Sequence, residues 1–414
     1  MKMPFAHCLY CFWLLLLLTP ATYADWPQWR GPERNDLSKE TGLLQSWPED
    51  GPKQLWLFKE AGIGYSGFSI AKGRLYTMGA RDDAERLIAI DIAQGKELWN
   101  AKVGGVLDNG YGDGPRGTPS VDGDCVYALS GTGDLICAAA ADGKVVWQKS
   151  MRQFGGQKPN WGYTESVLVD DGKVVCTPGG SKGAIVALDK KTGELIWQSK
   201  DFTDDAQYAS VVPVNLNGTR QYVQLTMQHI VGVSATDGRL LWQAGFPGST
   251  AVIPTPIVHG GKVYVTAGYG VGSKMVEVGP GHQVRDVYFN KVMKNHHGGA
   301  ILLDGYVYGY SDGPGWVCQD FNSGREVWAE KNALGKGAIA YADGRFYCLS
   351  ESNGTVALIE ASSKGWKEHG RFKLNPLSDK RSPSGRVWTH PVITDGRLYL
   401  RDQELLFAFD VKAK

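Results

Sequence analysis

The adjacent histidines at positions 296 and 297 are the first residues in the sequence that suggest metal chemistry. Neighbours on an extended strand point to opposite faces, and no third ligand follows at a regular spacing, so the pair does not predict a metal site. We expect His297 to face a central channel and His296 to pack between blades. The chain also lacks a phosphate-binding loop and a CxxCH haem motif. These patterns favour binding over catalysis.

The other residues that could recognise a ligand lie in irregular stretches between apolar strands. They combine aromatic rings with cations and a carboxylate, and such side chains form binding sites when a rigid scaffold brings them together. With His297, the candidate ligand-binding residues are Tyr65, Arg116, Trp161, Tyr163, Glu165, Tyr208, His297, Lys336, Trp388 and His390.

A repeated hairpin must position these residues. In Val186–Trp197, a short apolar run is followed by a polar turn with Gly193 and by a second apolar run that ends in Trp197. Four related copies keep the same four-residue spacing from Gly to Trp. They are Ile88–Trp99, Cys137–Trp147, Val231–Trp242 and Trp316–Trp328.

A second turn signal precedes each copy, and it recurs eight times. Dipeptides such as Lys72-Gly73, Asp122-Gly123 and Asn217-Gly218 suit two-residue hairpin turns. Successive turn glycines, from Gly73 to Gly396, are 39 to 52 residues apart, with no helical period between them. This self-similarity predicts an all-β, eight-bladed β-propeller of four-stranded antiparallel blades. Seven blades is the alternative, because the repeats after Gly261 and Gly344 lack the Trp.

The full pattern A-x-D-x-x-T-G-x-x-x-W, complete at Ala187–Trp197, resembles the tryptophan-docking repeat of the pyrroloquinoline-quinone (PQQ) repeat β-propellers. That superfamily includes quinoprotein alcohol dehydrogenases and the outer-membrane assembly propeller, and the resemblance covers nearly the whole mature chain. It implies that one Trp per repeat packs against the neighbouring blade. These structural residues would be Trp56, Trp99, Trp147, Trp197, Trp242 and Trp328.

The two ends of the chain hold complementary fragments of a repeat. The segment Lys53–Lys59, KQLWLFK, reads as an outgoing Trp strand without a preceding hairpin, whereas the last repeat, from His390, stops after three strands. Pairing the fragments would remove two exposed sheet edges. We therefore predict that an N-terminal strand closes the last blade.

The connections between repeats should reach one face of the ring, around the mouth of its channel. Aligned on the turn glycines, the candidate residues fall at similar depths, and Trp161, Tyr163 and Glu165 would share one face of an extended segment. Two interpretations remain open. The residues form a ligand pocket, or Arg116 and Glu165 pair with each other and plug the channel.

The resemblance also raises the question of the quinone cofactor. PQQ-dependent dehydrogenases use adjacent cysteines, a Trp platform and a calcium ion held by carboxylate and amide oxygens. The mature chain has no adjacent cysteines, and the calcium ligands cannot be placed on any motif. We expect no cofactor, with PQQ and calcium as the alternative.

The N-terminus predicts export. Residues 1–24 read as a signal peptide, with Lys2, an apolar run from Phe12 to Leu18 and small residues before Asp25. Residues 25–51 form an arm rich in Trp and Pro, expected to lie over the surface of the barrel, and residues 52–414 form the propeller. The mature chain would be periplasmic or extracellular, without a membrane span.

Charge and cysteine content narrow the choice of partners. Without the signal, 43 basic and 43 acidic residues remain, so the net charge gives the chain no general attraction to nucleic acid, although local charged patches stay open. Five cysteines remain, which leaves at least one free thiol, and a Cys125–Cys137 bridge stays open. We therefore predict a monomeric, exported, non-catalytic propeller that binds a protein, peptide or glycan in the cell envelope. A quinoprotein oxidoreductase with a divergent site is the alternative.

Overall fold

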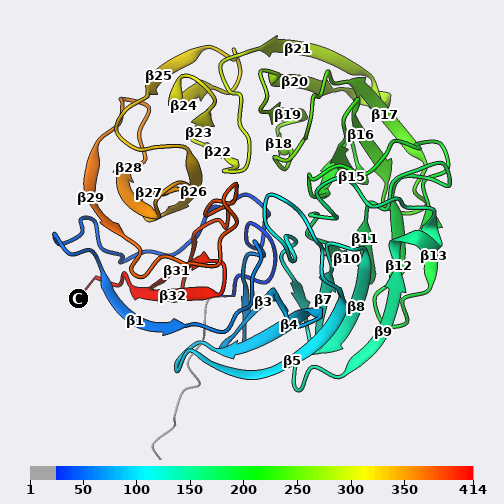
Figure 1. Cartoon of the computed structure of the whole chain (residues 1–414). Coiled ribbons are helices and arrows are strands. Elements are labelled where there is room, and N and C mark those ends of the chain that lie inside the picture. Colours follow the sequence, from blue (N-terminus) through cyan, green and yellow to red (C-terminus); the bar gives the residue numbers. More distant parts are fainter. Residues whose placement is uncertain (1–24, 414) are drawn as a thin grey trace, which may run out of the picture.

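The structure is a computed structural model that describes residues 25–413; the predicted signal peptide lies outside the described residues. Eight four-stranded antiparallel sheets form a ring around a central channel (Figure 1). In each sheet the first strand lies nearest the channel and the fourth lies at the rim. The prediction of eight blades is confirmed, and the seven-blade alternative is wrong.

Blades 1 to 4 follow the chain without interruption. Their strands are β2 (Ser69–Ala71), β3 (Arg74–Arg81), β4 (Ala84–Asp91) and β5 (Lys96–Gly105); β6 (Ser120–Asp122), β7 (Cys125–Leu129), β8 (Asp134–Ala139) and β9 (Val145–Ser150); β10 (Leu168–Asp170), β11 (Lys173–Cys176), β12 (Val186–Asp189) and β13 (Leu195–Gln198); and β14 (Val212–Leu216), β15 (Thr219–Leu225), β16 (His229–Ser234) and β17 (Leu240–Gly245). A short 3₁₀-helix, η1 (Met151–Phe154), follows β9.

Blades 5 to 8 repeat the same order, and the last one takes its outer strand from the N-terminus. Their strands are β18 (Ile257–His259), β19 (Lys262–Ala267), β20 (Gly272–Val278) and β21 (Val284–Asn290); β22 (Ala300–Leu303), β23 (Tyr306–Ser311), β24 (Gly315–Asp320) and β25 (Glu326–Glu330); β26 (Gly337–Ala342), β27 (Arg345–Ser350), β28 (Thr355–Glu360) and β29 (Glu368–Lys373); and β30 (Val392–Thr394), β31 (Arg397–Asp402), β32 (Leu405–Asp410) and β1 (Lys53–Phe58). The 3₁₀-helix η2 (Pro280–His282) lies between β20 and β21.

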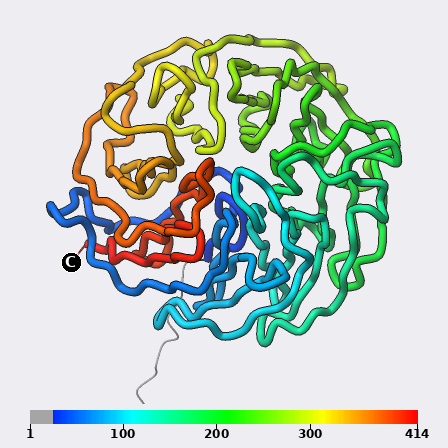
Figure 2. Tube along the Cα trace, in the orientation of Figure 1, coloured from blue at the N-terminus to red at the C-terminus, as the bar shows by residue number. Residues whose placement is uncertain are grey.

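The closing strand pairs as predicted. β1 runs antiparallel to β32, from Lys53 opposite Asp410 to Phe58 opposite Leu406. The blue N-terminal strand therefore lies beside the red C-terminal strand (Figure 2). The pairing leaves blade 8 with the same four strands as the other blades, so no ladder of the ring is left incomplete.

The turns between first and second strands explain the repeated dipeptides. In seven blades both turn residues have positive φ, as at Lys72 (50°) and Gly73 (75°), which is the geometry of a type I′ hairpin. Blade 2 differs, because Asp122 pairs with Cys125 and the turn is Gly123-Asp124, one residue later than the sequence suggested. Only Gly123 has a positive φ there.

The repeated tryptophans connect each blade to the next. Trp99 donates an indole hydrogen bond to the carbonyl of Ala140 in blade 2, and its ring lies against Gly143, where a Cβ atom would come within 2.5 Å. The same contact links the other members of this set to the following blade: Trp56 to Ile92, Trp147 to Lys190, Trp197 to Ala235 and Trp328 to Ser362.

Three blades depart from this pattern. Blade 7 has no Trp in its outer strand, and Phe372 lies against Gly51 instead. Trp242 donates instead to Gln221 of its own blade, at 2.6 Å, although its ring packs in a cluster shared with Val263 of blade 5. In blade 5, which lacks the Trp, Tyr288 reaches the carbonyl of Phe321 in blade 6. The tyrosine ring and hydroxyl therefore make the contact that an indole makes elsewhere.

The N-terminal arm lies over blades 7 and 8 through Glu40, Leu43 and Trp47, whereas its earlier residues Trp29 and Arg30 enter the channel, which the sequence did not predict. Trp26 pairs with Ile70 of blade 1. Beyond it, Arg34 reaches the carbonyl of Ser166 beside blade 3, and Leu37 pairs with Tyr341 of blade 7. Because its contacts reach blades on opposite sides of the ring, the arm crosses the channel and closes it from one side.

All five cysteines of the described residues are free thiols in the structure. Cys137 lies opposite Tyr127, and Cys125 lies opposite Ala139, so the two cysteines are diagonal rather than directly paired. Burial and the neighbouring Cys125 raise the pKa of the Cys137 thiol to about 12. At neutral pH this thiol is therefore protonated and unreactive.

Candidate functional site

A cavity of about 320 Å³ lies at the centre of the ring, on the side opposite the entry of the arm. Every blade-to-blade connection contributes to its wall, and Trp29 and Arg30 of the arm supply its floor. Eight of the ten residues predicted from the sequence line it: Tyr65, Arg116, Trp161, Tyr208, His297, Lys336, Trp388 and His390.

The remaining two predicted residues, Tyr163 and Glu165, point into the protein. Gly162 has a φ of 76°, which breaks the extended run and shifts the alternation of side chains by one residue. Trp161, Thr164 and Ser166 therefore face the cavity. The hydroxyl of Tyr163 donates to the carbonyl of Pro178 in the interior.

Glu165 is a structural carboxylate. It accepts hydrogen bonds from the backbone N–H of Thr177 at 2.6 Å and from the Thr177 hydroxyl at 3.2 Å. Burial raises the pKa of this carboxyl to about 7. The expected alternative, a channel plugged by an Arg116–Glu165 pair, is wrong, because no such pair forms between these two described residues.

A series of rings in mutual contact forms one side of the cavity. Tyr269 meets His296 edge to face at 4.5 Å between centroids, and His296 lies 3.7 Å from His297. The series continues through Trp388 at 4.5 Å to Tyr65 at 4.8 Å. His296 thus lines the cavity, so its predicted packing between blades is wrong. The planes of His297 and Trp388 meet at 34°, so these two rings pack closely without stacking in parallel.

Three further rings form the other side of the cavity mouth. Trp161 lies between Tyr111, at 6.2 Å, and Tyr208, at 5.7 Å, with edge-to-face geometry in both pairs. Tyr111 is half-exposed, so this side opens to solvent. The cavity mouth is therefore bordered by aromatic rings on both sides.

Arg116 extends the ring series with a cation. Its guanidinium lies 5.2 Å from the centroid of Tyr65 and donates to the carbonyls of Gly114 and Gly112 at 3.0 and 2.9 Å. It forms no ion pair with any of the described residues. Burial lowers the pKa of Arg116, but an arginine with a lowered pKa is still protonated at neutral pH. The charge is held in place and is not neutralised by direct contact with a carboxylate.

A second polar group surrounds Lys336. Its ammonium donates to Asp312 at 2.7 Å and to Nδ1 of His296 at 2.9 Å. Burial, together with Lys336, lowers the pKa of His296 to about 4, so the imidazole is neutral and carries its proton on Nε2. No acceptor among the described residues meets that Nε2–H.

Glu351 is the only carboxylate among the cavity-lining residues of the described chain. It accepts a hydrogen bond from the indole N–H of Trp388 at 3.1 Å, and burial raises its pKa. Arg386, on the same side, donates to the carbonyls of Pro383 and Gly385. Cations therefore outnumber carboxylates in this cavity.

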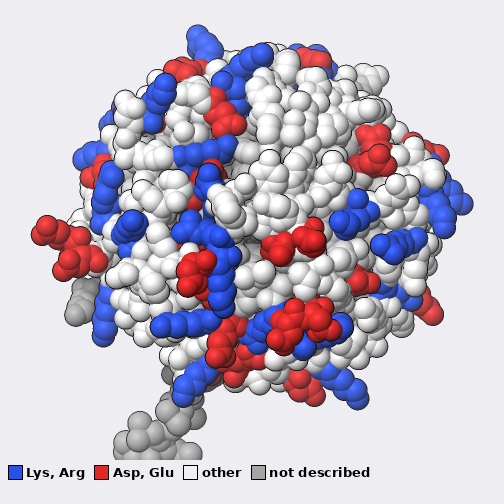
Figure 3. Space-filling view, in the orientation of Figure 1, with Lys and Arg blue, Asp and Glu red and all other residues white. Residues whose placement is uncertain are grey.

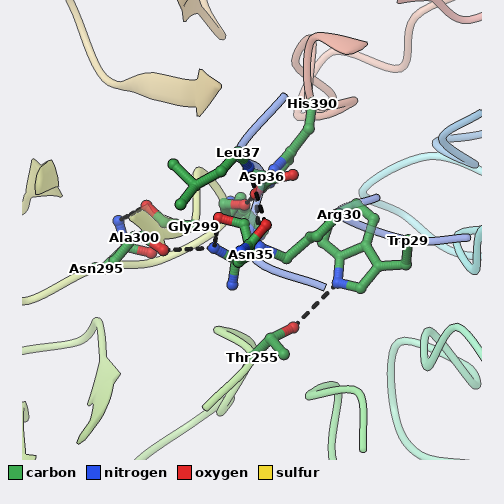
Figure 4. Close-up of polar contacts among 11 residues, drawn as sticks. Trp29, Arg30, Asn35, Asp36, Leu37, Thr255, Asn295, Gly299, Ala300 and His390 are labelled. Atoms are coloured by element: carbon green, nitrogen blue, oxygen red, sulfur yellow. Dashed lines mark hydrogen bonds and ion pairs between the residues drawn. The ribbon is translucent and has the colours of Figure 1, made fainter. Parts of the chain in front are cut away.

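The floor of the cavity is fixed by the arm (Figure 4). Nε of Arg30 donates to Asp36 at 2.6 Å, as expected for a structural ion pair, and Nη2 donates to the carbonyl of Ala300. Burial acts to raise the pKa of Asp36, but Arg30 and His390 together hold it below its ordinary value. Trp29 donates to the hydroxyl of Thr255 at 3.0 Å. These contacts anchor the arm to blades 5, 6 and 8.

Several lining residues escaped the sequence analysis. Tyr269 follows β19 and Glu351 follows β27, so both lie in turns between second and third strands. In an antiparallel blade those turns reach the same face as the connections into the first strands, which is a topological signal that could have identified them. Trp29 and Arg30 had no such signal, because nothing local shows that the arm enters the channel.

The lining residues do not fit a PQQ and calcium site. Calcium takes six to eight oxygen ligands, usually with several carboxylates. The cavity offers Glu351 alone, and no group of three or more His, Cys, Asp or Glu side chains suited to a metal occurs within residues 25–413. Trp388 could serve as a platform, but the rings of His297 and Tyr65 already pack against it, with centroids at 4.5 and 4.8 Å.

Fold and site together define an eight-bladed β-propeller of the PQQ-like repeat class, with a one-ended central cavity. The family model described as outer membrane protein assembly factor BamB matches residues 83–330, and the chain belongs to this family. The BamB structure from Moraxella catarrhalis superposes with a TM-score of 0.62 over 87% of this chain and 98% of that one, at 14% identity. This likeness concerns the fold.

Two curated relatives represent the two branches of this class. The BamB protein of Burkholderia pseudomallei is 26% identical over 275 residues, which cover 56% of this chain and 70% of that protein. Quinohemoprotein alcohol dehydrogenase ADH IIB of Pseudomonas putida is 34% identical over 122 residues, which cover 27% of this chain and 17% of that enzyme. The chain thus matches less than a fifth of the length of this dehydrogenase.

In the part of the chain from Asp25 to Ala413, no helix has the length and apolar character needed to span a bilayer. The visible face carries Lys and Arg side chains interspersed with Asp and Glu, without a large region of one sign (Figure 3). The charge balance predicted from composition therefore also describes this face.

Proposed function

We propose that the protein is an exported, non-catalytic binding protein of the cell envelope, which holds its ligand in the central cavity. The observation that carries this proposal is the one-ended cavity bordered by aromatic rings. A volume of about 320 Å³ is at the lower end of the range for small-molecule sites. The ligand is thus a small molecule or one protruding unit of a larger glycan, peptide or protein.

A role in envelope assembly fits the family. Three relatives that align with 43%, 56% and 64% of this chain are named outer membrane protein assembly factors. An oxidoreductase role receives less support, because the cavity has a single carboxylate and no adjacent cysteines occur among the described residues.

The proposal that the protein is exported rests on the N-terminal sequence. The intact mass of the secreted chain tests it, and we expect cleavage before Asp25.

The binding role is tested by filling the cavity. Ile253 lines the cavity, and no side-chain hydrogen bond depends on it, so Ile253→Trp should obstruct the site with little other damage. The matched control is Ile196→Trp on the outer strand β13, where the side chain is 46% exposed. We expect an envelope component that co-purifies with the wild type to be retained by the control and lost by Ile253→Trp.

The wild type and both variants are used to capture molecules from a cell-envelope fraction, and mass spectrometry identifies the component that co-purifies. Circular dichroism and the melting temperature should show that both variants fold. If both variants capture the same set of molecules as the wild type, the cavity is not the binding site and the proposal fails.

A further inference from the structure

Arg116 has the geometry of an anchor for an anion. Two of its five N–H groups are bound by the carbonyls of Gly112 and Gly114, and Tyr65 holds the guanidinium plane from one side. Three N–H groups therefore have no acceptor among the described residues. A carboxylate could take two of them in the bidentate arrangement that arginine favours. The side chain needs little reorganisation to accept such a group.

Three hydroxyl groups on other blades add hydrogen-bond donors to the wall of the cavity. Ser166 accepts from the N–H of Thr118, Ser210 accepts from the N–H of Ser166, and Thr255 accepts from the indole of Trp29. Each of these contacts uses a lone pair and leaves the O–H free to donate. The cavity therefore combines one unpaired guanidinium with several hydroxyl donors, which suits a ligand with many oxygens.

The closed floor limits how a polymer could enter. Trp29 and Arg30 end the cavity, and Arg30 is locked by Asp36 and Ala300. A chain cannot pass through the channel, so only its end can occupy the cavity. The aromatic mouth, with Tyr111 and Trp161 on one side and Tyr269 on the other, would then contact the next unit.

We propose that the cavity binds the terminal acidic sugar of a glycan, of the hexuronate type, with its carboxylate held by Arg116 and its hydroxyls by the Ser166, Ser210 and Thr255 side chains. This inference rests on the proposed binding function and specifies its ligand class. A neutral sugar would leave the guanidinium without a carboxylate in direct contact, because Glu85 and Asp113 act on it only at longer range. A peptide could also bind Arg116 through its carboxylate and the hydroxyl donors through its carbonyl oxygens, so it is tested as the competing ligand. A hexuronate carries its carboxylate and its hydroxyl oxygens on one compact ring, which suits a cavity of about 320 Å³.

The test is calorimetric titration of the mature protein with D-glucuronate, D-glucose, inorganic sulfate and tetraalanine. We expect saturable binding of D-glucuronate, at least tenfold tighter than that of each other probe. Arg116→Gln should weaken D-glucuronate binding tenfold or more, and Arg116→Lys should restore part of it. The matched control, Arg239→Gln, changes an exposed arginine in blade 4 and should leave the affinity unchanged.

Each other outcome overturns this inference in a distinguishable way. Equal affinity for D-glucose would show a neutral sugar site, and equal affinity for sulfate would show an unspecific anion site. Preference for tetraalanine would show a peptide site. If no probe binds while Ile253→Trp still loses its envelope component, the acidic-sugar inference fails and the proposed binding function stands.

Discussion

The indole N–H of Trp56 donates a 2.9 Å hydrogen bond to the carbonyl oxygen of Ile92, so the strand that completes blade 8 is also attached to blade 1. The Trp56 ring covers Gly95, where a Cβ atom would come within 2.5 Å of it. The closing strand thus has two attachments, a ladder to β32 and a tryptophan on the next blade. Ring closure depends on both.

Replacing Trp56 by alanine should therefore loosen the closure. We expect a loss of about 3 kcal/mol in the free energy of unfolding, because a large, partly buried aromatic and its hydrogen bond are removed. Urea denaturation measures this loss. The neighbouring Leu55 is 39% exposed, and Leu55→Ala should change stability by less than about 0.5 kcal/mol. Equal effects of the two changes would contradict the second attachment.

Substitutions at Trp197 and Arg116 should distinguish a residue that stabilises the fold from one that serves ligand binding. Trp197 is buried against Gly238 of blade 4, so Trp197→Ala should cost about 3 to 5 kcal/mol. Arg116 donates only to two carbonyls of its own connection, and Arg116→Ala should leave the urea midpoint close to that of the wild type. If Arg116→Ala destabilises the protein as much as Trp197→Ala, then Arg116 serves the fold and the cavity is a structural plug.

Arg401 provides a third attachment between the same blades. Its buried guanidinium donates to the carbonyl and hydroxyl oxygens of Gly62, Ser66, Thr77, Met78 and Gln403. Burial lowers the pKa of Arg401 to about 9, so it remains charged at neutral pH.

Removing this charge should open the junction of blades 8 and 1. Arg401→Met keeps much of the volume but leaves the buried carbonyls without donors, and we expect a loss of about 3 kcal/mol by urea denaturation. Arg239→Met, at an exposed position, is the control and should have almost no effect. A stability of Arg401→Met equal to that of the control would show that water replaces the guanidinium at little cost.

The sequence allowed the repeating part of the fold to be predicted, because each blade is specified by local signals. The turn dipeptides and the tryptophan four residues after a glycine can be recognised in the sequence without knowledge of the tertiary contacts. The unfinished repeat at His390 and the unpaired strand at Lys53 could be matched for the same reason. Arg401 could not be found this way, since four of its five acceptors lie between Gly62 and Met78, at the other end of the chain.

The site was only partly predictable. The alignment placed Arg116, Lys336 and Trp388 at one end of the channel, because the ring imposes a common depth on equivalent positions. It misplaced Tyr163 and Glu165, since a single left-handed residue, Gly162, reverses which side chains face inward. The floor could not be foreseen, because the arm enters the channel through contacts with blades on opposite sides of the ring.

PQQ should not bind at this site. Calorimetric titration with PQQ and calcium at micromolar protein should give no saturable heat, because Glu351 is the single carboxylate on the cavity wall of the described chain and Trp388 already packs against His297 and Tyr65. Reconstitution should likewise give no quinone absorption bands. Stoichiometric binding would instead favour a quinoprotein role.

Glu165 should make stability depend on pH. Burial raises its pKa to about 7 in the folded state, above the roughly 4.3 of an exposed glutamate. Between these values the unfolded chain has lost a proton that the folded chain retains, so stability falls as pH rises from about 4 to 7 and then levels off. Glu85, whose pKa burial also raises to about 7, should add a similar fall.

The contribution of Glu165 can be isolated with Glu165→Gln, which keeps the shape of the side chain but does not titrate. Urea midpoints measured from pH 5 to 8 should fall less steeply for this variant than for the wild type, because the contribution of Glu165 is then absent. The exposed Glu194→Gln is the matched control and should follow the slope of the wild type. If Glu165→Gln and the control show the same slope, Glu165 is ionised in the folded protein throughout this range, and its hydrogen bonds to Thr177 outweigh its burial.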